Sequence, residues 1–522
     1  MTQVTHGGRP RTRRPAPYAV LLVPAMLLTG GLAACSGDVT STQAPLPSPS
    51  APAGGTTGPS ATEEPRDDLA ALDPGDAAAL STPQADPVYP AYGDPSVDAL
   101  HYDLDLTWDA DERTLTGIET VLLRVTSDAD VVDHGRVRLD LAPTMAVTGA
   151  AVDDVEVEVE HRGDDLLVPL PAGTAPDDLV TVTLAYTGTP TPVDAPTTRS
   201  DLPSLGLTVD PEGQLWTMQE PYGAHTWYAV NDHPSDKARY TFTLQVDDPW
   251  TGIANGVQTS SSVADGVRTT TYDAADPMAS YLVTLAFGDY TETVVDGPRD
   301  LPISLWVPAG AEQYVDDLER TGAALTWVEG WLGPYPFDSA GVLLVEDSTS
   351  GMETQTLLTL GATAYSTSPA TLVHEMVHQW WGDLVTPADW RGLWMNEGMA
   401  MYLQLVWEAE DDGRPLDDLL GDYVLTEQRL RAEAGPPASY DPDQFGVSNV
   451  YLGPALMWHA IRQEVGDAAF RDAVRAWPTE QAGRSVGRDE LVSWWSERTG
   501  TELASLFDAW LDGEQSPAID LD

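Results

Sequence analysis

The sequence has one cysteine, one lysine and few basic residues of any kind. Cys35 is the single cysteine, so an intrachain disulfide is excluded and stability must come from packing. The 26 Lys and Arg residues face 82 Asp and Glu residues, which gives a formal net charge of −56. Such a surface repels nucleic acid and anionic headgroups, so we expect no nucleic-acid partner. We assign the total charge to solubility and argue function only from individual carboxylates.

Long hydrophobic runs are also scarce, and the one near the N-terminus is short. Four arginines precede an apolar run over residues 18–32, which Pro24 interrupts. A short apolar run after basic residues is typical of a secretory signal rather than a membrane span. It leads into the sequence LAAC, which ends at Cys35 and resembles the lipobox of bacterial lipoproteins. The resemblance implies cleavage before Cys35, a lipid on its sulfur and a place on the extracellular face of the bacterial cell membrane. The alternative is a secreted chain with an incidental cysteine.

Composition divides the chain into four segments. Residues 1–34 are the predicted lipoprotein signal peptide. Residues 35–86 are rich in Pro, Ser, Thr and Ala, and we expect a disordered tether because this composition cannot bury a core. Two folded domains should follow, over residues 87–297 and 298–522, since a chain of 522 residues is too long for one core.

Period-two alternation of apolar and polar residues marks the first of these domains. Clusters of Gly, Pro and Asp separate the alternating runs, as expected for short strands joined by turns. The pattern predicts a mostly antiparallel β-domain of the sandwich or saddle kind. The runs cover residues 100–108, 155–161, 179–186, 239–246 and 279–287.

Helical periodicity replaces this alternation in the second domain. Apolar residues recur at helical spacing, and one short strand-like run lies over residues 340–347. The sequence therefore predicts an α-rich domain. The helical runs cover residues 313–332, 371–381 and 397–407.

Two histidines within the run 371–381 form a candidate metal site. His374 and His378 are four residues apart, so both imidazoles leave one face of a helix and can share an ion. Glu375 follows the first histidine and can hold the attacking water. Ser368 and Pro369 provide a hydroxyl N-cap and a proline at the first helical position. The alternative is a structural histidine pair on a buried helix.

Glu397 supplies a third ligand. It lies nineteen residues after His378, far enough for a loop and a return on a second helix. Catalytic zinc takes three protein ligands and keeps one open position, whereas structural zinc sites are more often closed and cysteine-rich. The set His374, His378 and Glu397 therefore predicts one catalytic Zn²⁺ per chain.

This stretch resembles the gluzincin signature of the aminopeptidase N family, which also includes leukotriene hydrolase. The signature is H-E-x-x-H, eighteen residues and a glutamate. The resemblance implies a β-domain followed by a thermolysin-like catalytic domain, and it extends over nearly all of residues 88–522. The large C-terminal helical domain of longer members is expected to be missing. The flanking matches are Trp381-Gly382, Val385-Thr386, Trp394 and Asn396-Glu397-Gly398.

Other family motifs appear in order along the chain. SGMET at 350–354 resembles the exopeptidase motif G-x-M-E-N, which implies that Glu353 binds the α-amine of the substrate. Ser350 and Thr354 depart from that motif. Residues 217–240 resemble the stretch near the end of the family's β-domain that provides a second amine anchor. This implies Glu220, with Gln219 as a further candidate.

The segment 450–466 resembles the one that carries the family's catalytic tyrosine, and this implies Tyr451. Gly453 and Pro454 stand where a basic residue and a glycine are usual. The alternative for Tyr451 is a packing residue at a helix start.

Together the resemblance and the residues predict a zinc aminopeptidase that acts as a monomer on peptides with a free N-terminus. Glu375 would be the general base and Tyr451 the donor to the developing oxyanion. An endopeptidase or an epoxide hydrolase on the same site is one alternative. A non-catalytic surface lipoprotein that binds peptides is the other.

Overall fold

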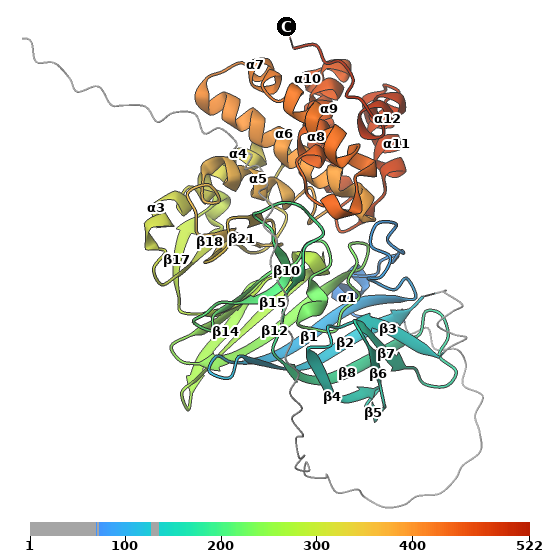
Figure 1. Cartoon of the computed structure of the whole chain (residues 1–522), viewed down its shortest axis with the longest axis vertical. Coiled ribbons are helices and arrows are strands. Elements are labelled where there is room, and N and C mark those ends of the chain that lie inside the picture. The colour runs from blue at the N-terminus through green and yellow to red at the C-terminus, as the bar shows by residue number, and fades with distance from the viewer. Residues whose placement is uncertain (1–68, 70–71, 127–134, 522) are drawn as a thin grey trace, which may run out of the picture. The chain divides into compact units, whose positions relative to one another are not determined.

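The computed structural model describes residues 69, 72–126 and 135–521. The described residues belong to one compact unit, with strands prevailing in the earlier part of the chain and helices in the later part (Figure 1). The predicted signal peptide, Cys35 and most of the predicted tether lie outside the described residues. Each helix in the described part of the chain is too short or too polar to cross a membrane.

The last part of the predicted tether is packed against the β-domain. Residues 74–78 form the short helix α1 (Pro74–Ala78), and Arg239 donates to Asp76 at 3.0 Å. Asp86 is buried and accepts hydrogen bonds from three backbone N–H groups, including that of Trp390 at 2.8 Å. The prediction of a tether up to residue 86 is therefore wrong for residues 72–86. Acidic side chains make the contacts that hold this segment. Its low content of apolar residues therefore did not indicate that it is folded.

An eight-stranded sheet forms the frame of the β-domain. In β8 the residues Val180, Val182, Leu184 and Tyr186 are buried and alternate with partly exposed ones, so one face joins the core. Neighbouring strands pair antiparallel except β1 and β12, which are parallel. The order is β14, β15, β12, β1, β2, β8, β4, β5. The bounds are β1 (Val97–Asp109), β2 (Thr114–Val125), β4 (Met145–Val152), β5 (Val155–Glu156), β8 (Leu179–Gly188), β12 (Lys237–Asp247), β14 (Val257–Ala264) and β15 (Val267–Ala279).

Two smaller sheets complete the domain, and buried residues of all three sheets share one hydrophobic core. The predicted β-rich first domain is confirmed. A five-stranded sheet has the order β13, β16, β11, β10, β9, and a three-stranded sheet has the order β3, β7, β6. The bounds are β3 (Arg136–Asp140), β6 (Glu160–Arg162), β7 (Asp165–Pro169), β9 (Val193–Asp194), β10 (Ser204–Val209), β11 (Leu215–Met218), η2 (Ala224–Thr226), β13 (Thr251–Ala254), η3 (Ser280–Leu282) and β16 (Leu285–Gly288).

Two predicted strands are broken. The run 155–161 contains only the short strands β5 and β6, which belong to different sheets. The run 279–287 contains the 3-10 turn η3 between the end of β15 and β16. In both cases the chain changes sheets within an alternating run, and alternation alone does not reveal such a crossing.

The boundary between the domains lies earlier than predicted. Strand β17 pairs with β18 along its whole length, and both belong to a sheet of order β17, β18, β19, β21, β20. A boundary at 297 would separate these partners, so it belongs before Tyr290. The bounds are β17 (Tyr290–Asp296), η4 (Pro298–Asp300), β18 (Pro302–Pro308), β19 (Ala340–Val345), β20 (Gly351–Met352) and β21 (Leu357–Gly361).

Helices make up most of the second domain, as predicted. Helix α5 lies against α6, and α6 lies against α9. Tryptophan side chains belong to the hydrophobic core around these helices, and the ring centroids of Trp458 and Trp495 lie 4.8 Å apart. Helix α5 ends at His378, three residues before its predicted end. The bounds are η5 (Glu312–Tyr314), α3 (Val315–Leu318), α4 (Thr321–Leu332), α5 (Pro369–His378), β22 (Thr386–Pro387), η6 (Trp390–Gly392), α6 (Leu393–Asp412), α7 (Leu416–Gly421), α8 (Val424–Ala434), η7 (Pro437–Ser439), η8 (Pro442–Gln444), α9 (Asn449–Val465), α10 (Asp467–Glu480), β23 (Ser485–Val486), α11 (Arg488–Thr499) and α12 (Ala504–Leu511).

Candidate metal centre

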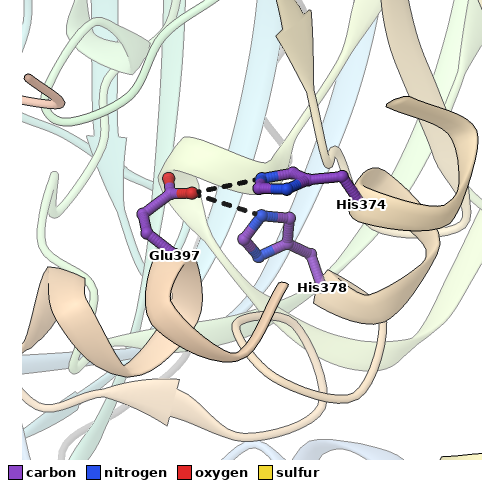
Figure 2. A group of neighbouring side chains, drawn as sticks. All are labelled: His374, His378 and Glu397. Carbon is purple, nitrogen blue, oxygen red and sulfur yellow. Dashed lines mark hydrogen bonds and ion pairs between the residues drawn. The ribbon is translucent and has the colours of Figure 1, made fainter. Parts of the chain in front are cut away.

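Two adjacent helices bring the three predicted ligands together. Helix α5 starts as predicted, because the Ser368 hydroxyl accepts from the Thr371 N–H at 3.3 Å. It carries His374 and His378, and α6 carries Glu397. Figure 2 shows the two imidazoles and the carboxylate pointing toward one another.

The distances among the donor atoms match a zinc site. The Glu397 Oε2 atom lies 3.3 Å from His374 Nε2 and 3.5 Å from His378 Nε2 (Figure 2). Zinc bonds of ~2.0–2.1 Å in a tetrahedron place neighbouring ligand atoms ~3.3 Å apart. All three residues are buried. One ion therefore fits between them without rearrangement of the backbone.

Hydrogen bonds on the far side of each imidazole set its orientation. His374 Nδ1 lies 3.0 Å from Gln404 Oε1, and His378 Nδ1 lies 3.1 Å from the carbonyl oxygen of Trp381. Both partners are acceptors, so each Nδ1 carries the proton and each Nε2 lone pair faces Glu397. Gln404 was missed from the sequence. Its position seven residues after Glu397, two turns along the same helix face, was the available signal.

Glu375 lies beside the ligand set, next to His378. Burial raises the pKa of its carboxyl to about 8, although the nearby His378 acts in the opposite direction. Donor atoms of Glu353, Glu375 and His378 all lie within 4.8 Å of one another. Gly351 passes so close that a Cβ there would lie 2.4 Å from Glu375 Oε1. A side chain at this position of SGMET would therefore displace the Glu375 carboxylate.

The two predicted amine anchors also meet at this place. Donor atoms of Glu220, Glu353 and Glu397 lie within 4.8 Å of one another. Burial raises the pKa of both Glu220 and Glu353, and for Glu220 the charge of Glu353 adds to the effect. The buried Oε1 atoms of Glu220 and Glu353 have no hydrogen-bond partner among the described residues. Two buried acceptor atoms without donors destabilise the folded protein. A cationic group that donates hydrogen bonds to both would remove this cost in free energy.

Gln219 does not join this group. It is fully buried; its amide nitrogen donates to the Ser280 carbonyl at 2.6 Å, and its amide oxygen accepts from Trp227 at 3.0 Å. The structure thus gives Gln219 packing partners within the β-domain in place of the predicted contact with an amine.

Two of the departures from the family motifs, Thr354 and Pro454, have local explanations. The Thr354 hydroxyl donates to the Leu357 carbonyl and lies 2.9 Å from Thr359 Oγ1, so it closes the turn between β20 and β21. Pro454 lies in α9 against Gly398 of α6, where a Cβ on the glycine would lie 2.3 Å from the proline Cβ. A glycine in one helix therefore accommodates the proline in the other.

Tyr451 lies in the first turn of α9, beside the ligands. Its ring stacks on that of His374 with centroids 5.9 Å apart and an interplanar angle of 20°. Its hydroxyl accepts a hydrogen bond of 3.2 Å from Arg199, a residue of the β-domain. The sequence did not single out Arg199, which lies in a loop rich in Pro, Thr and Asp.

Comparison with known proteins agrees with this geometry. The Peptidase M1 N-terminal domain model matches residues 98–282, and the Peptidase family M1 domain model matches residues 317–510. Aminopeptidase N of Streptomyces lividans is 25% identical over 452 residues, which cover 80% of this chain and 50% of that protein. The chain thus spans about half the length of that relative, and likewise 51% of aminopeptidase N from Lactobacillus delbrueckii.

A solved structure matches over nearly its whole length. The M1 zinc metallopeptidase of Deinococcus radiodurans is 27% identical with a TM-score of 0.72, and the match covers 84% of this chain and 99% of that one. A mutant of the same Deinococcus protein has been solved with a Tyr-Ser-Ala substrate bound, and it matches with a TM-score of 0.71.

The fold and the donor set together define a zinc metallopeptidase architecture of the gluzincin class, a β-domain followed by an α-rich domain with two histidines and a glutamate. The chain belongs to peptidase family M1.

Proposed function

We propose that this protein is a zinc-dependent aminopeptidase that removes the N-terminal residue of peptides. The observation that carries the proposal is a pair of carboxylates beside the predicted zinc ligands, Glu220 and Glu353, whose buried Oε1 atoms lack hydrogen-bond partners among the described residues. An α-ammonium group has the charge and the donors that these oxygens need. A zinc endopeptidase would have no use for two such groups at this place.

The chemistry follows from the positions of the side chains. Zinc, when bound by His374, His378 and Glu397, would polarise the scissile carbonyl and activate the attacking water. Glu375 accepts the proton of that water and can return it to the leaving amine, and a pKa raised by burial to about 8 suits both steps near neutral pH. Tyr451 donates a hydrogen bond to the carbonyl oxygen as it gains negative charge.

Glu220 and Glu353 determine which bond is cut. A peptide whose ammonium group is held by these two carboxylates can present only its first peptide bond to Glu375. The carboxylates come from different domains, since Glu220 follows β11 and Glu353 follows β20. The register of the substrate therefore depends on the β-domain as well as on the catalytic domain.

The test is hydrolysis of matched peptides by the full chain. Free peptides and aminoacyl-nitroanilides should be cleaved, and N-acetylated copies of the same peptides should not. A chelator should abolish the activity and zinc should restore it. Cleavage of acetylated peptides at the same rate would favour an endopeptidase, and the absence of any chelator-sensitive hydrolysis would favour a peptide-binding lipoprotein.

Glu375→Gln is the matched control for this test. The amide keeps the size of the side chain but cannot accept the proton, so activity should fall while zinc is still bound. Zinc content measured on the purified variant separates loss of the base from loss of the metal.

We further propose that the chain is anchored by lipid at Cys35 on the extracellular face of the cell membrane and acts there as a monomer. The LAAC sequence after the apolar run supports the anchor. Expression with a labelled fatty acid should label the wild-type chain and not Cys35→Ser. A label retained by the variant would contradict the anchor, and the size of the detergent-extracted protein tests the monomer.

A further inference from the structure

A loop of the β-domain reaches the segment that precedes the catalytic tyrosine. The loop joins β9 to β10 and covers residues 195–203. The Pro196 carbonyl accepts from the Phe445 N–H at 2.9 Å, and the Thr198 hydroxyl donates to Gln444 Oε1 at 2.6 Å. The loop and the segment 444–446 are thus joined by backbone and side-chain hydrogen bonds that lie within three residues of Arg199 and within seven residues of Tyr451.

The guanidinium group of Arg199 donates four hydrogen bonds from this loop. Its Nε and Nη2 atoms donate to the two carboxylate oxygens of Asp201, at 3.2 and 2.6 Å. Its Nη1 atom donates to the Gly446 carbonyl at 3.0 Å and to Tyr451 Oη at 3.2 Å. The carboxylate holds the guanidinium from one side, so the nitrogen that faces Tyr451 has a fixed position.

The direction of this hydrogen bond matters for the tyrosine. Tyr451 Oη accepts from Arg199, so the phenolic proton is left free to point elsewhere, and the ring already stacks on the zinc ligand His374. A hydroxyl that accepts from a charged donor is polarised and becomes a stronger donor itself. A stronger donor stabilises an acceptor most when that acceptor gains negative charge. The reacting carbonyl oxygen gains this charge only as the transition state forms.

We propose that Arg199 is a positioning residue of the active site, which orients the Tyr451 hydroxyl and strengthens it as a hydrogen-bond donor to the reacting carbonyl oxygen. The inference rests on the proposed peptidase function and deepens it. It gives the β-domain a part in the chemical step in addition to its part in holding the substrate amine. Arg199 acts through Tyr451 and does not itself touch the substrate.

The inference makes a specific kinetic prediction for Arg199→Gln. The lost hydrogen bond has a charged donor, so kcat should fall by roughly ten- to a hundredfold. The KM for a free tripeptide should stay within about twofold, because the interaction strengthens mainly in the transition state. A rise in KM at unchanged kcat would instead mean that Arg199 binds substrate, and it would overturn the inference.

A double-mutant cycle with Tyr451→Phe separates positioning from general structural damage. Tyr451→Phe should itself lower kcat by about a hundredfold or more. In that background Arg199→Gln should change kcat by less than about twofold, because the group through which it acts is already missing. Full additivity of the two losses would overturn the inference.

Two control variants share features of Arg199 but do not reach Tyr451. Arg138 is another partly exposed arginine of the β-domain, with a carboxylate partner in Asp165 and an acceptor in the Ala91 carbonyl. Thr198→Val removes a hydrogen bond between the same two segments. Arg138→Gln and Thr198→Val should both keep kcat within about twofold of wild type, as expected of changes that leave the Arg199–Tyr451 contact in place.

Arg199→Lys covers the case in which Arg199→Gln fails to fold. Lysine keeps the positive charge but lacks the planar guanidinium group with its fixed N–H donors. The kcat of Arg199→Lys should therefore lie between the values of the wild type and Arg199→Gln. A wild-type kcat in Arg199→Lys would contradict the requirement for a fixed donor. Zinc content and thermal unfolding are measured on every variant. If the wild-type chain itself shows no chelator-sensitive hydrolysis, the proposed function fails; if the wild type is active and Arg199→Gln equals it, only the inference fails.

Discussion

At the scale of single residues, the hydrogen bonds of the two histidine Nδ1 atoms set how the candidate zinc ligands are oriented. His374 and His378 each have an acceptor at Nδ1, and both Nε2 atoms therefore face Glu397. One of these acceptors is a backbone carbonyl that no substitution can remove. The other is the side chain of Gln404, which is open to test.

Gln404→Ala should weaken zinc binding by about ten- to a hundredfold, because the His374 ring loses the partner that sets its tautomer and orientation. Competition with a chromophoric chelator measures the effect directly. The Gln404 amide nitrogen donates to Glu408 at 2.8 Å. Gln245→Ala is the matched control, since Gln245 likewise donates to a carboxylate, Asp105, but lies in the β-domain. Equal zinc affinity in Gln404→Ala and the wild type would contradict this role.

Glu353→Gln tests the amine anchor at the same scale. The neutral amide loses the charge that pairs with the substrate ammonium, so the KM for free peptides should rise by roughly ten- to a hundredfold. Zinc content should not change, because Glu353 is not one of the three ligands. An unchanged KM would mean that the buried oxygen of Glu353 meets some other group.

At the scale of elements, strand β2 carries an acidic residue into the core of the large sheet. Glu119 is fully buried and accepts from the Ala229 N–H at 3.0 Å. Burial raises the pKa of its carboxyl from 4.5 to about 8. The folded protein therefore holds this proton more tightly than the unfolded chain. The contribution to stability is complete below pH 4.5 and is lost as the pH rises to about 8.

Glu119→Gln should remove this pH dependence. The amide cannot ionise, so the variant does not lose stability as the pH rises. The free energy of unfolding of the variant minus that of the wild type should therefore increase by up to about 1.4 kcal/mol per pH unit across this window. Urea unfolding near both ends of the window measures the difference. Glu156→Gln, an exposed change on β5, serves as the control. A constant difference across the window would show that Glu119 is not buried as a neutral acid.

At the scale of the whole molecule, the segment before the β-domain joins the two domains. Asp86 accepts from the N–H groups of Val88 and Tyr89 in the β-domain and from that of Trp390, just before α6. Tyr89 also donates to the Pro442 carbonyl at 2.9 Å. The segment 86–89 is thus bonded to the turn that precedes the helix of Glu397 and to the segment that leads to Tyr451.

Asp86→Ala should lower the free energy of unfolding by about 2 kcal/mol or more, because three buried donors lose their acceptor. Thermal unfolding of the full chain measures it. Asp73→Ala is the control, since Asp73 caps the short helix α1 at the exposed edge of the same segment. If the two variants lost the same small amount of stability, Asp86 would not join the domains.

Local sequence patterns predicted the elements but not their partners. The helix of His374, the strand β8 and the order of β-rich and α-rich domains were predictable, because each depends on a period within a few consecutive residues. The run 155–161 and the segment 72–86 were predicted wrongly. In the first the chain changes sheets, and in the second charged side chains make the contacts, so neither leaves a periodic apolar pattern.

The sequence by itself determined which residues meet at the candidate metal centre, His374, His378 and Glu397, with Glu375 beside them. The helical period places the two histidines and Glu375 on α5, and Glu397 was identified by its distance along the chain from His378. Only the tertiary structure decided that Gln404 lies against His374, that the carboxylates of Glu220 and Glu353 meet, and that Arg199 donates to Tyr451. These depend on contacts between residues far apart in the chain, and such contacts are specified by the packing of the whole fold rather than by any one segment.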